Sequence, residues 1–373
     1  MKKVLFTSHV ANFVKFNKPF MKWFQEQGWE VHYASLDEEE IPCCDRHFKV
    51  DFNRSPYSFD NVRAYFQLKK LLKQENYDLI HCHTPMGGVV TRLAARSFRK
   101  KGTKVLYTAH GFHFYQGAPK KNWLLYYNME RFLARYTDCI ITMNEEDYRA
   151  ASDPKFGAKC VKKIDGVGVD LSRFHPVSAE EKSTLRREYG FRDEDFILIY
   201  VAEFTENKNH IFLLQLVQEL WRGIPNLKII FAGRGDTMEW CQDFVKREGL
   251  GSVVYFLGYR HDVELLYRIA DISVSVSRRE GLPVNVIEAM ASGLPVVCSK
   301  IRGQIDLVEE GKNGFLFSLG KPDSGNVLID QIVMLCQNED LRSSMGIRGA
   351  EVAQKYSLGH AIENMAEIYR EYG

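Results

Sequence analysis

The feature that most restricts the fold is a regular alternation of short β-rich segments with longer amphipathic ones. Segments such as Val4-Leu-Phe-Thr7 and Cys139-Ile-Ile-Thr-Met143 are short and apolar, which predicts buried strands. Residues 62–74 and 211–221 repeat apolar side chains at helical spacing, which predicts helices. Strands that alternate with helices pair in parallel, because each helix carries the chain back along the sheet. We therefore expect an α/β protein with doubly wound parallel sheets.

The alternation occurs twice, so we expect two domains. Residues 1–170 contain one run of strands and helices, and residues 190–357 contain the second. Between them, about 165–192, lie a Gly-x-Gly pair, a proline and a charged helix, a composition that predicts a connecting region. A chain of 373 residues is long enough for two domains of ordinary size.

Charge is unevenly distributed along the chain. The net charge is only +2, but residues 1–170 contain 27 Lys and Arg against 19 Asp and Glu. A basic first half indicates an anionic partner. No nucleic-acid-binding module is visible in the sequence, so we expect a lipid diphosphate or an anionic membrane surface rather than nucleic acid.

Cysteine usage and hydropathy indicate the compartment. The eight cysteines form no C-x-x-C pair, so neither a zinc ribbon nor a disulfide scaffold is indicated. The N-terminus has no long apolar core of a signal peptide, and no run of about 18 apolar residues is present. We therefore expect a reduced, cytoplasmic protein.

The stretch 277–297 joins a tight turn, a short helix and a strand. Gly281 permits the tight turn. Pro283 suits the first position of a helix and Gly293 the residue after its end, which predicts a helix over about 283–292. The free amides at such a helix start form an anion-binding site.

Two carboxylates flank this helix start. Glu280 precedes it in the turn, and Glu288 lies about a turn and a half into the helix. Together they could hold a ligand that carries hydroxyl groups on both sides of a phosphate.

The spacing of these two residues resembles a known signature. Glu280 and Glu288, followed by Ala-Met-Ala-Ser-Gly293, are similar to the E-x7-E motif of the retaining glycosyltransferases of family 4, which have the GT-B fold. The resemblance covers nearly the whole chain and is densest over 196–317. It implies two Rossmann-like domains that face each other across a cleft, with a last helix (about 358–373) packing back on the N-terminal, acceptor-side domain. The C-terminal domain would then bind the nucleotide sugar.

The resemblance also implies roles for individual residues. Glu288 would hold the ribose hydroxyls and Glu280 the sugar hydroxyls. Lys208 would offset the charge that builds on the leaving diphosphate, and His110 would lie near the reacting carbon of the donor. The residues whose backbone would face the diphosphate lie at the helix start: Gly281, Leu282, Pro283 and Val284.

Further positions match the nucleotide half of the family, and some depart from it. Gly233 and Arg234 resemble its glycine turn, and Tyr259 and Arg260 lie in the turn that usually faces the base. Glu203 stands where the family has a diphosphate-binding arginine. Either another basic residue, such as Arg234 or Arg302, replaces that arginine, or Glu203 contacts something other than phosphate. The loop 8–12 also lacks the glycine-rich turn that many members carry after the first strand.

Two histidines raise the question of a metal. His81 and His83 share one face of a predicted strand, but the sequence offers no further ligand, so we predict no metal. Enzymes of the GT-B fold generally need none for their chemistry. The resemblance therefore implies no cofactor, since the nucleotide sugar is a substrate.

The segment 13–24 has two interpretations. Its aromatic residues at helical spacing predict an amphipathic helix that packs on the sheet and exposes its lysines. Alternatively, the segment is an interfacial surface for anionic lipid, extended by the basic residues of 99–121. The second interpretation predicts peripheral contact with the inner face of a membrane.

These observations favour one function and leave two alternatives. We expect a transferase that moves a hexose or N-acetylhexosamine from a UDP-sugar to a saccharide acceptor. The basic first half favours a lipid-linked acceptor, such as a polyprenyl diphosphate saccharide, in the synthesis of capsule, exopolysaccharide or another bacterial glycan. The alternatives are a UDP-sugar epimerase of the GT-B fold and a non-catalytic binding subunit of that fold.

Overall fold

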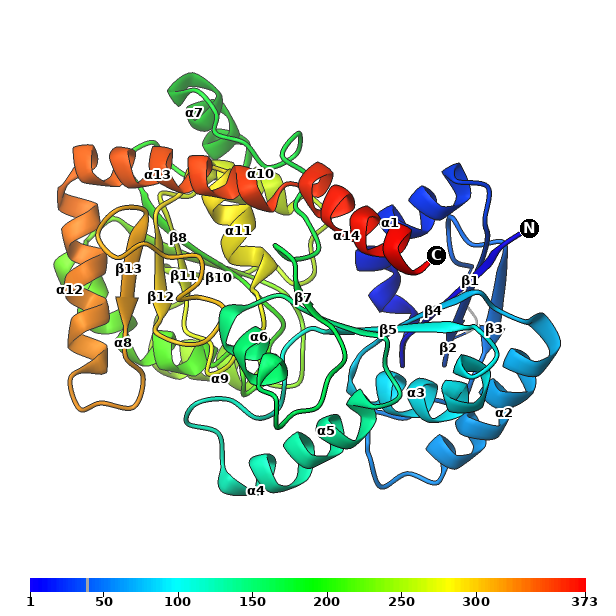
Figure 1. Ribbon diagram of the computed structural model, residues 1–373. Helices are drawn as coiled ribbons and strands as arrows, with labels where there is room; N and C mark the ends of the chain where they lie inside the picture. The colour runs from blue at the N-terminus through cyan, green and yellow to red at the C-terminus, as the bar shows by residue number, and fades with distance from the viewer. Residues whose placement is uncertain (38–39) are drawn as a thin grey trace. The chain divides into compact units, whose positions relative to one another are not determined.

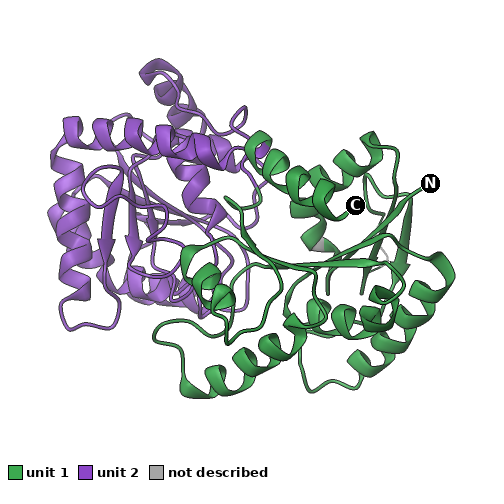
Figure 2. Ribbon diagram, in the orientation of Figure 1, with its two compact units in different colours: residues 1–167, 359–373 green, residues 168–358 purple. Residues whose placement is uncertain are grey.

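The computed structural model describes residues 1–37 and 40–373, which divide into two compact α/β units (Figure 1, Figure 2). Unit 1 comprises residues 1–167 and 359–373, and unit 2 comprises 168–358. The segment that the sequence suggested as a connection therefore belongs largely to unit 2. Its helix α7 (Ala179–Glu188) is held there by the buried Arg186, which donates to the carbonyl of Ile269 at 3.0 Å and to the carboxylate of Asp271 at 2.7 Å.

Unit 1 contains a seven-stranded sheet in the order β3-β2-β1-β4-β5-β6-β7, and neighbouring strands pair in parallel. The strands are β1 (Lys3–Thr7), β2 (Glu30–Ser35), β3 (Arg46–Lys49), β4 (Leu79–His83), β5 (Lys104–Ala109), β6 (Cys139–Thr142) and β7 (Val161–Lys163). The strand order reverses between β1 and β4. Their carboxyl ends therefore form the position where ligands bind in open α/β sheets.

Helices cover both faces of this sheet. In Figure 1, α1 and α14 lie on one side of it and α2, α3 and α5 on the other. The helical segments are η1 (Ala11–Phe13), α1 (Val14–Glu26), α2 (Asp60–Glu75), α3 (Pro85–Arg99), α4 (Lys120–Asn122), η2 (Trp123–Tyr127), α5 (Asn128–Ala134), α6 (Glu145–Ser152) and α14 (Leu358–Tyr372). The segments α4, η2 and α5 follow one another without a break, so they form one continuous helical stretch that contains a π-helical turn over Trp123–Tyr127.

The aromatic face of α1 packs inward against α14. Phe20 and Phe24 are buried, and the ring of Tyr369 in α14 lies 4.5 Å from that of Phe24. Tyr369 also shares a 2.8 Å hydrogen bond with His81 of β4. Phe20 and Phe24 of segment 13–24 therefore pack inward, as the packing interpretation expects, whereas Phe13 and Phe16 are half-buried. None of the helices in the described part of the chain has the length and apolar character needed to cross a membrane.

Unit 2 contains a six-stranded parallel sheet in the order β10-β9-β8-β11-β12-β13. The strands are β8 (Phe196–Val201), β9 (Leu227–Ala232), β10 (Val254–Phe256), β11 (Ile272–Ser275), β12 (Val296–Ser299) and β13 (Gly314–Phe317). The other helices of this unit are α8 (His210–Gly223), α9 (Met238–Arg247), α10 (Val263–Ile269), α11 (Val284–Ala291), α12 (Ser324–Gln337), α13 (Glu339–Ala353) and η3 (Gln354–Tyr356). The strand order reverses between β8 and β11, as it does between β1 and β4 in unit 1.

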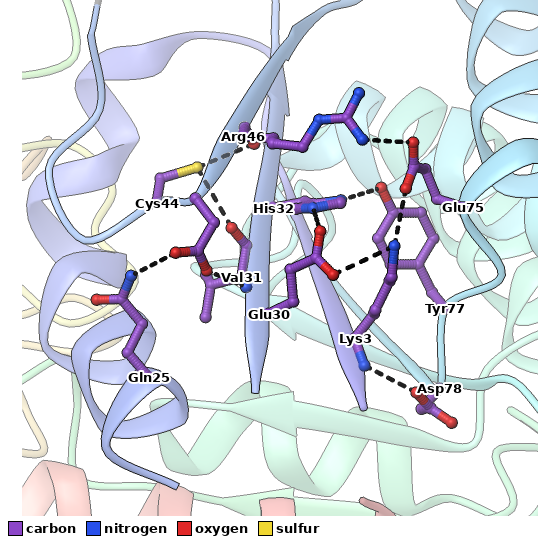
Figure 3. Close-up of polar contacts among 11 residues, drawn as sticks. Lys3, Gln25, Glu30, Val31, His32, Cys44, Arg46, Glu75, Tyr77 and Asp78 are labelled. Carbon is purple, nitrogen blue, oxygen red and sulfur yellow. Dashed lines mark hydrogen bonds and ion pairs between the residues drawn. The ribbon is translucent and has the colours of Figure 1, made fainter. Parts of the chain in front are cut away.

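A network of opposite charges ties together the strand starts of unit 1 (Figure 3). Lys3 Nζ lies 3.2 Å from Glu30 Oε2 and 3.0 Å from Glu75 Oε2. Arg46 Nη1 lies 2.8 Å from Glu75 Oε1, and the ring of His32 lies 2.7 Å from Glu30. The hydrogen bond from Lys3 lowers the pKa of Glu75. These contacts link β1, β2 and β3 to the end of α2.

Candidate active site

The loops that follow β8 and β11 meet at the switch point of unit 2. Asn207 Nδ2 donates to the carbonyl of Arg279 at 2.9 Å, and the amide of Arg278 donates to the carbonyl of Asn207 at 2.8 Å. The buried Tyr200 hydroxyl donates to the carbonyl of Lys208 at 2.8 Å and contacts Ser277 Oγ at 2.9 Å. These bonds fix the two loops to each other, so the side chains that they carry keep a defined spacing.

Lys208 and Glu280, both predicted site residues, lie together on these loops. Lys208 Nζ donates to Glu280 Oε1 at 2.6 Å, and the two side chains are 21% and 11% exposed. The buried Arg302 donates from Nε to the backbone carbonyl of Glu280 at 3.0 Å. The loop after β12 therefore supports the turn that presents Glu280.

Gly303 lets the loop after β12 approach the backbone of this turn closely. Its φ is +78°, and a Cβ there would lie 2.2 Å from the carbonyl oxygen of Gly281. Only glycine fits at such a distance and dihedral angle. The backbone of residue 303 thus packs directly against the turn Glu280–Leu282.

Helix α11 begins directly after this turn. Pro283 is the residue before the first helical position, one place earlier than the sequence suggested, and Val284 starts the helix. Asn285 Nδ2 donates to the carbonyl of Val201 at 2.8 Å, which anchors the first turn to the end of β8. Glu288 is half-buried in the second turn. The first-turn amides of a helix have no acceptor inside it, so the start of α11 can bind an anion.

Gly233, a predicted site residue, and Gly235 lie in the loop after β9. A Cβ at Gly233 would lie 1.9 Å from the carbonyl oxygen of Ala202, and one at Gly235 would lie 2.4 Å from that of Phe204. The close approach that these glycines permit is therefore to the loop after β8. Glu203 and Arg234 are both exposed on these two loops.

Tyr259 and Arg260 follow β10 and differ in their contacts with the rest of the protein. The Tyr259 ring is 60% exposed. Arg260 instead donates from Nε to Asp262 at 2.8 Å, and it holds the pKa of that carboxyl down to about 2. Asp262 also accepts from the Tyr189 hydroxyl at 2.6 Å. Arg260 therefore has an acidic partner within its own loop.

In unit 1, His110 follows β5 and is hydrogen-bonded to His83 at the end of β4. The distance between His83 Nδ1 and His110 Nε2 is 3.1 Å. Phe13 packs edge-on against His110 with ring centroids 4.6 Å apart. Burial lowers the pKa of His110 to about 3 and that of His83 well below its ordinary value. Both rings are therefore neutral near pH 7, and His83 Nε2 has no hydrogen-bond partner among the described residues.

The turn after β4 lies close to the loop after β1. Thr84 has a φ of +64°, a strained value for a residue with a side chain. A Cβ at Gly87 would lie 2.7 Å from Thr84 Oγ1 and 3.2 Å from the amide of His9. Gly87 thus lets the start of α3 approach the loop after β1 at the switch point of this sheet.

The chain matches known proteins along its whole length. Residues 181–352 match the family described as glycosyl transferases group 1, and residues 3–144 match the one described as glycosyl transferase 4-like. EpsD of Bacillus subtilis (strain 168), whose name assigns it provisionally to the glycosyltransferases, is 44% identical over 372 residues, which cover 100% of this chain and 97% of EpsD. The chain belongs to the group 1 glycosyl transferases.

Two further comparisons concern this glycosyltransferase. It is 26% identical, over 83% of its own length and 79% of the relative's, to the UDP-Gal:alpha-D-GlcNAc-diphosphoundecaprenol alpha-1,3-galactosyltransferase of Escherichia coli. Its fold matches that of HepE from Anabaena, solved in complex with UDP-glucose, with a TM-score of 0.81 at 20% identity over 100% of both chains. The expected GT-B fold is confirmed.

The glycosyltransferase has one cluster of described side chains close enough together to hold a metal. Ligand atoms of Glu30, His32 and Glu75 lie within 4.8 Å of one another. Lys3 lies between the two carboxylates and Arg46 contacts Glu75, so their charge is already balanced (Figure 3). The cluster also lies at the strand starts, at the opposite edge of the sheet from His83 and His110. We interpret it as structural.

The hydrogen bond between His83 and His110 was not expected from the sequence, in which His83 and His81 suggested only a possible metal site. The structure instead gives His81 two hydroxyl partners, Thr108 at 2.7 Å and Tyr369 at 2.8 Å. The available signal was that β4 ends in His83 and His110 directly follows β5, so neighbouring parallel strands bring the two histidines to the same edge.

Proposed function

We propose that this glycosyltransferase moves a hexose or N-acetylhexosamine from a UDP-sugar to a lipid-linked saccharide, with retention of configuration. The proposal rests on the Lys208–Glu280 pair beside the start of α11, at the switch point of unit 2. The names of the Escherichia coli relative and of the HepE complex support the choice of a UDP-sugar as donor. The former name also supports a diphosphate-linked lipid as acceptor.

In the proposed reaction, the bond between the sugar C1 and the diphosphate oxygen breaks while the acceptor oxygen bonds to C1 on the same face. The acceptor proton passes to the departing diphosphate. Lys208 and the amides at the start of α11 would stabilise the negative charge that collects there. The reaction then needs no protein nucleophile.

The remaining roles concern binding and orientation. Glu280 would accept hydrogen bonds from sugar hydroxyls and Glu288 from those of the ribose. Burial keeps the His110 imidazole neutral at pH 7, so it would contribute a hydrogen bond rather than a positive charge near the sugar. We expect no resident metal or cofactor, because Lys208 and the helix start supply the positive field that the leaving group needs.

Thermal unfolding in the presence of a panel of UDP-sugars tests the donor assignment. One or more of them should raise the melting temperature, and Glu288→Ala should abolish the shift. Glu239→Ala, which removes an exposed carboxylate from α9 of the same unit, should leave the shift intact. A panel that gives no shift, or an equal loss in both variants, would contradict the assignment.

Product analysis tests the reaction class. A transferase should release UDP only when a polyprenyl diphosphate saccharide is present. Conversion of the donor alone into a new UDP-sugar, seen by NMR, would identify an epimerase instead. Binding of UDP without turnover of any tested pair would favour a non-catalytic subunit.

A lipid-linked acceptor also requires contact with a membrane, and this belongs to the same proposal. The sequence suggested segments 13–24 and 99–121 as the contact surface. Because Phe20 and Phe24 of α1 are buried against Tyr369 of α14, that helix would offer a membrane chiefly its exposed lysines. The cytoplasmic leaflet, rich in anionic lipid, is the surface that a basic protein of this kind would meet.

A further inference from the structure

Exposed apolar side chains gather on two segments of unit 1. Within the described residues, Tyr57, Phe59, Val62 and Phe66 form one group, and Phe59 is 89% exposed. Trp123, Leu124, Leu125 and Phe132 form the second group, and Leu124 is 75% exposed. Scattered surface hydrophobes are normal, whereas clusters of this kind indicate an interaction surface.

The two groups lie on the same layer of the unit. Helix α2 packs on α3, and α3 packs on α5, so all three cover one face of the sheet (Figure 1). Phe59, Val62 and Phe66 follow one another at helical spacing, which places them on one outward side of α2. We call the exposed side of residues 54–73 and 120–135 the α2–α5 surface.

This surface also adjoins the edge that carries His83 and His110. The loop with Tyr57 and Phe59 follows β3, and the loop that leads to Trp123 follows β5. The carboxyl ends of parallel strands lie at one edge of a sheet. The apolar groups therefore flank the same edge of unit 1 as the two histidines.

The charge of the α2–α5 surface is almost entirely positive. Its two segments contain nine Lys and Arg residues and two acids. All nine are exposed: Arg54, Arg63, Lys69, Lys70, Lys73, Lys120, Lys121, Arg131 and Arg135. Of the two acids, Glu130 is buried and paired with Arg92 at 2.8 Å, and Asp60 accepts hydrogen bonds from Ser58 and Asn53. Little negative charge therefore offsets the basic residues.

We propose that the α2–α5 surface docks on an anionic lipid bilayer. Aromatic and leucine side chains enter the boundary between headgroups and acyl chains, while lysines and arginines around them reach lipid phosphates. Five of the nine basic residues are lysines, a residue type depleted from protein–protein interfaces, so the composition favours lipid over another protein. The importance of this docking for catalysis rests on the proposed function: docking would bring a membrane-embedded acceptor to the edge of the sheet that carries His83 and His110.

Co-sedimentation of the full chain with vesicles tests the proposal. The protein should bind vesicles of phosphatidylcholine and phosphatidylglycerol, bind those of phosphatidylcholine alone more weakly, and be released by salt. The double variant Phe59→Ser, Phe66→Ser should weaken binding by about tenfold or more, since insertion scales with buried apolar area. Replacing Lys69, Lys70 and Lys73 by Glu should weaken binding to the anionic vesicles only.

Two control variants make the test specific. The variant Trp240→Ser with Ile347→Ser removes two exposed apolar side chains, 51% and 62% exposed, from unit 2 and should bind vesicles as the parent does. Replacing Lys15, Lys18 and Lys22 of α1 by Ala should have a smaller effect than the α2 variants. Wild-type protein that fails to bind anionic vesicles, or controls that lose as much binding as the α2 variants, would overturn the proposal.

A second copy of the chain is the competing occupant. If Phe59→Ser with Phe66→Ser converts a dimer into a monomer in the absence of lipid, the surface is an interface between copies and the proposal fails. Sugar transfer to a water-soluble acceptor distinguishes membrane docking from the proposed function. The Phe59→Ser, Phe66→Ser variant should retain this transfer, because a soluble acceptor does not require contact with a membrane. Loss of vesicle binding with intact transfer supports docking, whereas a wild-type protein that binds vesicles but transfers nothing contradicts only the proposed function.

Discussion

Substituting Gly303 by alanine provides a sharp test of how the site is built. Residue 303 has a φ of +78°, and a Cβ on it would lie 2.2 Å from the carbonyl oxygen of Gly281 and 2.9 Å from its carbonyl carbon. That peptide follows Glu280 directly. The substitution therefore pushes on the turn that carries Glu280 without altering any proposed ligand-binding side chain.

The expected cost has two parts. An alanine in the left-handed region costs about 1 kcal/mol relative to glycine. Real Cβ contacts essentially never fall below 3.0 Å, so the backbones must separate, and overpacking of this kind typically costs about 1–3 kcal/mol. We expect Gly303→Ala to lower the free energy of unfolding of unit 2 by about 2–4 kcal/mol. A shift of the turn by about 1 Å would lower turnover by about 100-fold.

Gly320→Ala is a matched control, since residue 320 has a φ of +79° with nothing within 4 Å of the added Cβ. It should show the dihedral cost alone and retain donor binding. Denaturant unfolding gives the stability of both variants, and calorimetric titration with UDP gives their affinity. If Gly303→Ala is as stable as Gly320→Ala and binds UDP equally well, the turn is not supported as we describe.

Three further predictions follow from other parts of the molecule. Lys208→Met should weaken UDP binding by about tenfold or more, as expected for the loss of a charge-assisted contact, with Lys208→Arg recovering part of it in the same titration. His83→Leu should reduce turnover by about fivefold to tenfold, the worth of one hydrogen bond to His110, while UDP affinity stays unchanged. Burial lowers the pKa of His81 to about 3, so below pH 6.5 the unfolded chain binds a proton at this residue that the folded chain does not. The free energy of unfolding should therefore decrease as the pH is lowered, by about 2 kcal/mol from this residue between pH 7 and pH 5. In denaturant unfolding, His81→Gln should lose correspondingly less stability over the same pH range.

Much of the fold follows from patterns that are local in the sequence. Alternating strands and helices predicted the parallel sheets, and the glycine and proline around residues 281–283 located α11 to within one position at its start. The pairing of Lys208 with Glu280 is less local, but both follow strands that flank the switch point of unit 2. Their proximity could therefore be expected once the alternation was recognised.

Other features depend on partners that are remote in the sequence. The aromatic face of α1 could not be assigned to a protein or a lipid partner, because Tyr369 covers it from more than 300 residues away. The close approach of Gly233 to the carbonyl of Ala202 could not be predicted either, because the two residues lie about 30 positions apart in the sequence. By contrast, Arg260 lies two residues from Asp262, so their ion pair could have been predicted from spacing alone.

The return of α14 to unit 1 affects the order in which the protein can be made. Residues 359–373 leave the ribosome after the whole of unit 2, yet they supply Tyr369 to the packing of Phe24 and to the hydrogen bond of His81. During synthesis unit 1 therefore cannot complete its folding until unit 2 has been synthesised, and part of its apolar interior stays uncovered until then. Such an intermediate exposes apolar surface and is prone to aggregate unless a chaperone binds it. A released chain truncated before residue 359 would contain all of unit 2 but an incompletely covered unit 1.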